Sequence, residues 1–96
     1  MNMDIQNIQK QIAPILKKYR VIRASIFGSL ARGEGSGESD VDILVQLDDN
    51  VGLLEFVGLK LELEESLGSK VDLVEYDTIK RAIRDRVLAD QVVVHG

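Results

Sequence analysis

The first segment of the chain repeats apolar residues at intervals of three or four positions. Its members are Ile5, Ile8, Ile12, Ile15, Leu16 and Tyr19. This spacing places their side chains on one face of a helix. Pro14 falls inside the pattern. Because proline lacks an amide hydrogen and clashes with the preceding turn, either the helix kinks there or a second helical piece begins near it. We expect a break near Ala13.

Four later segments have the short, β-branched composition that is typical of strands. They are Val21–Phe27, Val41–Leu47, residues 70–76 and residues 91–95. The first ends at Gly28, which indicates a tight turn, and turn residues at 48–50 close the second. Residues 30–34 are compatible with a short helix, and residues 33–39 have the glycine and serine content of a loop.

The longest predicted helix covers Leu53–Leu67. Its apolar residues have helical rather than alternating spacing, and Gly68 stands where a left-handed C-terminal cap is favourable. We expect its leucines to contribute to the core, although leucines on more than one face could also serve a partner interface. A last helix is expected over residues 79–88, with Asp77 or Thr78 as its cap.

Helices and strands therefore alternate along the chain, which predicts a sheet covered by helices. The short connection between the first two strands leaves open whether some strand pairs are antiparallel, and we expect a mixed sheet. The predicted class is α/β (α+β), with a small mixed β-sheet of about four strands and helices packed on it. A single domain is expected over residues 1–96.

Composition narrows the range of functions. The absence of cysteine excludes disulfides, thiolate nucleophiles and cysteine-based zinc sites. A formal charge of −4 argues against direct nucleic-acid binding, which usually needs a basic surface. Apolar runs are far shorter than the roughly 20 residues of a membrane helix, so no membrane association and a cytoplasmic location are expected. A domain of this size has little room for an enclosed site, so we expect an open one.

A strand that runs into Gly28-Ser29 and then into a helical turn is suited to binding an anion. Glycine lets the backbone approach a ligand closely, and the start of a helix offers unpaired amide groups. The Ser29 hydroxyl could donate to a phosphate oxygen. The plainer interpretation is an ordinary turn with a helix cap, and the dipeptide alone favours that one.

Three aspartates form the second part of the pattern. Asp40 and Asp42 are two positions apart, so on a strand their carboxylates point to the same face and can converge on one cation. Asp72 interrupts an apolar strand, where an unpaired carboxylate would cost several kcal/mol if it were buried, so we expect it to need a cation too. If the second and third strands are neighbours, Asp42 and Asp72 lie side by side, and oxygen donors of this kind suit Mg²⁺. The alternative is a strand-entry cap and a solvated edge residue.

This pattern resembles a known signature. Gly28-Ser29, ten residues and Asp40-Val41-Asp42 have the form G-S-x10-D-x-D of the polymerase-β-like nucleotidyltransferase superfamily, and Asp72 fits its third carboxylate. Nearly the whole chain resembles the minimal nucleotidyltransferase (MNT) proteins, which act as antitoxins paired with HEPN-domain toxins. The resemblance implies a nucleotidyltransferase fold and Mg²⁺-dependent transfer of AMP from ATP to a tyrosine of the partner toxin, in a hetero-oligomer with it.

The resemblance also implies roles for individual residues. Asp40, Asp42 and Asp72 are expected to be catalytic and to bind the metal, with Asp72 either a metal ligand or the general base. Gly28 and Ser29 are expected to bind the nucleotide. Two other functions stay open: a binding module that neutralises a partner by occlusion, and transfer to a small molecule, although enzymes of that last kind carry an additional domain.

Overall fold

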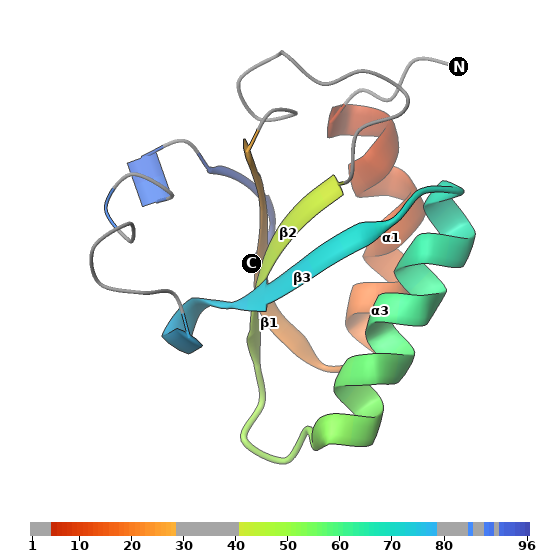
Figure 1. The fold of residues 1–96 in the computed structure, drawn as a ribbon, viewed down its shortest axis with the longest axis vertical. Helices are drawn as coiled ribbons and strands as arrows, with labels where there is room; N and C mark the ends of the chain where they lie inside the picture. The colour runs from red at the N-terminus through yellow and green to blue at the C-terminus, as the bar shows by residue number, and fades with distance from the viewer. Residues whose placement is uncertain (1–4, 29–40, 79–84, 86–87, 90) are drawn as a thin grey trace.

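The computed structural model describes residues 5–28, 41–78, 85, 88–89 and 91–96 (Figure 1). The elements in this part of the chain are α1 (Ile5–Lys18), β1 (Val21–Phe27), β2 (Val41–Leu47), α3 (Leu53–Leu67), β3 (Val71–Glu75), the 3₁₀ turn η1 (Tyr76–Thr78) and β4 (Val92–His95). No helix among the described residues is both long and apolar enough to cross a membrane.

The four strands form one mixed sheet in the order β3-β2-β1-β4. β1 pairs with β2 and with β4 in antiparallel orientation, whereas β2 and β3 are parallel. Two parallel strands cannot be joined by a tight turn, so the chain between them makes a crossover that contains α3. The expectation of a mixed sheet with helices packed on it is confirmed.

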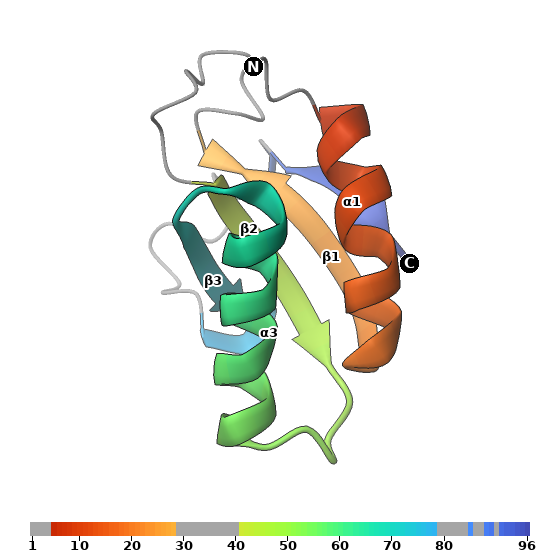
Figure 2. The same cartoon turned by 90° about the vertical axis from the view of Figure 1, so that its right-hand side faces the viewer.

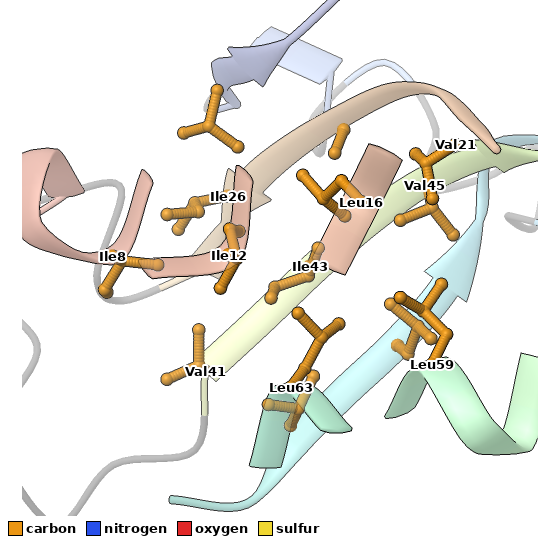
Figure 3. Packing of buried hydrophobic residues seen from close by; sticks show 14 residues of the cluster. Ile8, Ile12, Leu16, Val21, Ile26, Val41, Ile43, Val45, Leu59 and Leu63 are labelled. Atoms are coloured by element: carbon orange, nitrogen blue, oxygen red, sulfur yellow. The ribbon is translucent and has the colours of Figure 1, made fainter. Parts of the chain in front are cut away.

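Helices α1 and α3 lie on the same face of the sheet and cover β1, β2 and β3 (Figures 1 and 2). Alternate residues of each strand point to this face. In β2 they are Val41, Ile43 and Val45, all fully buried. Ile8, Ile12 and Leu16 of α1 and Leu59 and Leu63 of α3 pack onto them (Figure 3). The core is therefore a single apolar layer between two helices and a sheet.

The expected break near Ala13 is wrong, because α1 runs without interruption from Ile5 to Lys18 with Pro14 inside it. Pro14 is exposed, so the carbonyl that loses its hydrogen bond four residues earlier faces water. Ile12 and Leu16, on either side of the proline, are both fully buried. Packing on both sides holds the helix together across the proline.

α3 is held at both ends. The Glu55 carboxylate accepts a hydrogen bond from the Gly52 amide, at 3.1 Å, which satisfies one of the free donors at the helix start. At the other end Gly68 adopts the left-handed conformation, with φ of 64°, and its amide donates to Glu64 O. The Glu64 side chain accepts from the Val71 amide at 3.0 Å, which ties the helix to the first residue of β3.

The two helices are also linked by an ion pair, with Lys18 Nζ at 2.8 Å from Glu62 Oε1. This hydrogen bond lowers the pKa of Glu62 and raises that of Lys18. Lys18 is exposed and Glu62 is half-buried, so water screens the pair and it contributes little to stability. The helices are therefore held to each other mainly by the apolar residues beneath them.

The other element predictions agree with the structure where it describes them. The third strand is slightly shorter than residues 70–76, because the chain turns into η1 at Tyr76. The helix expected at residues 30–34, the loop at 33–39 and most of the helix at 79–88 lie outside the described residues, although Asp85, Leu88 and Ala89 are helical.

The core layer predicts a contrast between two leucines of α3. Leu63→Ala should lower the free energy of unfolding by about 2–5 kcal/mol, because Leu63 is fully buried and its loss leaves a cavity. Leu61→Ala, the same change at a side chain that is 59% exposed, should stay within about 0.5 kcal/mol of the parent. Urea denaturation followed by circular dichroism measures both, and equal losses would contradict the assignment of the two faces.

Candidate functional site

Two carboxylates stand side by side on the sheet face opposite α1 and α3. Asp42 in β2 and Asp72 in β3 are direct partners in the parallel register. Their strand neighbours Val41, Ile43, Val71 and Leu73 belong to the core under the helices. Because side chains alternate along a strand, both aspartates point away from that core. The condition set by the sequence, that the second and third strands be neighbours, is met.

The pair differs in exposure. Asp42 is half-buried on a central strand, whereas Asp72 is exposed on β3, which is the edge strand of the described sheet. The expectation that burial makes Asp72 need a cation is therefore wrong, because an edge position leaves its carboxylate in water. What remains is like-charge repulsion between directly opposed residues on strands about 4.8 Å apart. A shared cation would relieve it.

The main chain at Gly28 lies close to the carboxylate of Asp42. It follows β1, whose last residue, Phe27, is paired with Asp42. Its φ of 74° lies in the region that glycine adopts without strain. A Cβ added at this position would overlap Oδ2 of Asp42 and lie 3.1 Å from its Cγ. Glycine is thus required both by the turn and by the space that the Asp42 carboxylate occupies.

The structure therefore brings together three of the five residues predicted for the site, namely Gly28, Asp42 and Asp72. Ser29 and Asp40 lie outside the described residues. Within the described part of the chain, no group of three or more histidine, cysteine or acidic side chains is placed to hold a metal ion. The two opposed carboxylates do provide hard oxygen donors of the class that Mg²⁺ prefers.

A buried polar network on the same face was not found from the sequence. Ser25 is fully buried on β1, and its hydroxyl shares a hydrogen bond with the Tyr76 hydroxyl. Tyr76 donates its proton to Gln91 Oε1 at 2.7 Å, so Ser25 must be the donor to Tyr76. The Arg23 guanidinium lies 4.3 Å from the centre of the Tyr76 ring. The one signal in the sequence is a serine between two apolar residues of a strand.

This network supports the site by joining segments that are distant in the chain. It connects β1 to the turn after β3 and to the residue before β4, across β2. Buried hydroxyl groups that lost these partners would carry a desolvation cost of about 1–3 kcal/mol each. The strands that carry Gly28, Asp42 and Asp72 are therefore held by polar contacts on this face and by the apolar layer on the other.

Comparison with known proteins identifies the family. Residues 10–96 match the family described as "Polymerase beta, Nucleotidyltransferase". A protein of Methanocaldococcus jannaschii, named as a candidate protein adenylyltransferase, is 49% identical over 92 residues, which are 96% of this chain and 99% of the relative. The protein adenylyltransferase MntA of Thermococcus cleftensis is 41% identical over 78 residues, covering 81% of this chain and 79% of that protein.

Solved structures agree. A protein described as a candidate minimal nucleotidyltransferase superposes with a TM-score of 0.81 at 32% identity, and the match covers 95% of this chain and 96% of that one. The MNT antitoxin in complex with a tri-AMPylated HEPN toxin of Shewanella oneidensis has a TM-score of 0.72 at 22% identity, over 95% of this chain and 71% of that one, which shows a shared fold. Because the family match spans residues 10–96 and a relative at 49% identity aligns with 96% of the sequence, this chain belongs to the polymerase beta nucleotidyltransferase family.

Proposed function

We propose that this nucleotidyltransferase moves AMP from Mg²⁺-ATP to a hydroxyl of a partner protein, a tyrosine of a HEPN-domain toxin, and so acts as its antitoxin. The observation that carries the proposal is the register that sets Asp42 opposite Asp72, with the Gly28 backbone against Asp42. Support for a protein acceptor comes from the relative named protein adenylyltransferase MntA, at 41% identity.

The proposal gives each residue of the site a task. Asp42 and Asp72, together with Asp40, would hold Mg²⁺, which supplies charge neutralisation at the phosphates when it is bound. The Gly28 backbone and the Ser29 hydroxyl would contact the triphosphate. The missing Cβ of Gly28 lets the Asp42 carboxylate lie close to the main chain that would contact the phosphates.

Asp72 is the better placed of the two described carboxylates to meet an acceptor. It is exposed on β3, at the edge of the described sheet, so a side chain of another protein can reach it without moving a strand. In that position it would accept the proton of the acceptor hydroxyl while the hydroxyl oxygen bonds to the α-phosphorus. The bond from this phosphorus to the bridging oxygen breaks, and pyrophosphate leaves.

Removing the carboxylate pair should weaken nucleotide binding. We expect the double variant Asp42→Asn and Asp72→Asn to bind ATP at least tenfold more weakly in the presence of Mg²⁺, a loss of about 1.4 kcal/mol or more. Asp49→Asn, the same change at an exposed residue of the turn after β2, should bind like the parent. Calorimetric titration with and without Mg²⁺ measures the difference, and unchanged binding in the double variant would refute the site.

Gly28→Ala separates the effect of space from that of backbone strain. Gly28 and Gly68 both have positive φ, and a methyl group at either costs about 1–2 kcal/mol of folding stability. At Gly68 the added Cβ has nothing within 4 Å, whereas at Gly28 it overlaps the Asp42 carboxylate. We therefore expect Gly28→Ala alone to weaken Mg²⁺-ATP binding tenfold or more. Equal affinities for the two variants in the same titration would show that the close approach has no role.

The antitoxin activity has its own test. When the chain is co-expressed with a HEPN-domain toxin, intact-mass measurement should show AMP added to the toxin, and growth should be restored. The Asp42→Asn and Asp72→Asn variant should do neither, because transfer requires the carboxylates. If this variant restored growth without any added mass, neutralisation by occlusion would replace the proposed reaction.

A further inference from the structure

The outer side of α3 is apolar where a solvent-facing helix is usually polar. Leu53, Leu54, Val57 and Leu61 are 77%, 86%, 45% and 59% exposed, and they make up what we term the outer ridge. Their spacing of three, four and seven positions places them along one side of the helix, opposite Leu59 and Leu63 in the core. An apolar helical row of this kind, rimmed by polar residues, marks a contact surface.

The outer ridge continues into a cavity of about 510 Å³. Leu53 belongs to both, and Phe56, Leu73 and Val74 supply most of the remaining apolar lining. The cavity lies where the first turn of α3 meets the last residues of β3. Its size is enough for one or two large side chains of another molecule. Ridge and cavity together therefore offer a row of contacts and an anchoring point at one end.

Carboxylates border this apolar surface at its cavity end, whereas Lys60 and Lys70 lie near Leu61 at the other end. A second hollow of about 210 Å³ shares Val51 and Glu75 with the cavity, and its lining adds Asp48, Asp49 and Asp77. Neither set of described lining residues contains a lysine or arginine. α3 itself carries four glutamates and one lysine. A second copy of this surface would be repelled by the first, whereas a basic partner would be attracted.

We propose that the outer ridge and its cavity dock a helix of the partner protein, one with apolar side chains along one face and lysine or arginine residues beside them. Interdigitation of the partner's apolar row with Leu54, Val57 and Leu61 provides the contact. The acidic residues around the cavity set its orientation and exclude acidic partners. That this partner is also the protein that accepts AMP rests on the proposed function.

The position of this surface suits an acceptor. Glu75, which lines the cavity, is three residues after Asp72 on β3, a separation of about 10 Å along the strand. A protein held on α3 and over the end of β3 thus lies beside this edge strand, and it meets Asp72 by extending around the edge to the opposite face of the sheet. Docking and reaction would use different residues, so each can be removed without the other.

The test uses a short fluorescein-labelled helical peptide with leucines on one face and lysines on both sides of them, without ATP or Mg²⁺. We expect it to bind the parent chain, and to bind the double variant Leu54→Gln and Leu61→Gln at least tenfold more weakly. The matched control is Ile22→Gln with Val93→Thr, two similarly exposed apolar residues on β1 and β4, which should bind like the parent. Fluorescence anisotropy gives the affinities.

Two further peptides and one hydrodynamic measurement show which kind of molecule binds the outer ridge. Peptides with glutamate in place of lysine, or serine in place of leucine, should not bind. Equal binding of the serine peptide, equal binding by the α3 variant, or no binding at all would overturn the proposal. So would a parent dimer in sedimentation velocity that the α3 variant converts to monomer, because a second copy would then cover the ridge.

The two proposals fail in different ways. Calorimetric titration of Mg²⁺-ATP into the α3 variant should give the parent affinity, since none of its changes touches Asp42 or Asp72. If the chain binds ATP but does not distinguish the leucine–lysine peptide from the control peptides, the docking proposal is refuted and the nucleotidyl transfer proposal stands. If the chain binds the leucine–lysine peptide specifically but does not bind ATP, the nucleotidyl transfer proposal is refuted and the docking proposal stands.

Discussion

The parallel pairing of β2 with β3 is the constraint on which the candidate site depends. Side chains alternate along a strand, so a slip of one residue in this register would turn Asp72 into the core and leave Asp42 without a neighbour. The register is held from both sides. Val71 and Leu73 pack under α3, and the Glu64 side chain of that helix binds the first amide of β3. The crossover helix thus joins β2 to β3 and also fixes the position of β3, which carries Asp72.

The two faces of the sheet are stabilised by different kinds of interaction. Under α1 and α3 the contacts are apolar and non-directional. They give most of the stability of the fold but do not fix the orientation of individual groups. On the opposite face, Ser25, Tyr76 and Gln91 are joined by directional hydrogen bonds between segments far apart in the chain. A nucleotidyltransferase needs carboxylates held in fixed relation to the main chain, and this second kind of contact, close to them on the same face, suits that need.

α3 links the proposed reaction to the proposed docking. Its inner residues Leu59 and Leu63 stabilise the strand register, and its outer ridge leaves an apolar row in solvent. An occlusion mechanism would need only the outer ridge. It would leave unexplained why two carboxylates stand directly opposite each other beside the Gly28 backbone. The family, the register and that close approach together favour a chain that both holds a partner and modifies it.

Much of this could be predicted from local patterns. The four strands, both described helices and the left-handed cap at Gly68 followed from periodicity and spacing, because these depend on residues close in sequence. The pairing of Asp42 with Asp72 was predicted only if the second and third strands are neighbours, which the order of strands in the sheet decides. The break at Pro14 was wrong, because burial of Ile12 and Leu16 outweighs one lost hydrogen bond. The exposure of Asp72 was missed, because the order of strands decides which one is at an edge.

The sequence by itself determined the elements, the family signature and the residue types of the site. Only the tertiary structure decided which leucines of α3 face water, that Ser25 finds its partner in Tyr76, and that Gly28 lies against Asp42. The physical reason is distance along the chain. Ser25 and Tyr76 are 51 residues apart, and a contact of that range depends on how whole elements pack rather than on any local preference.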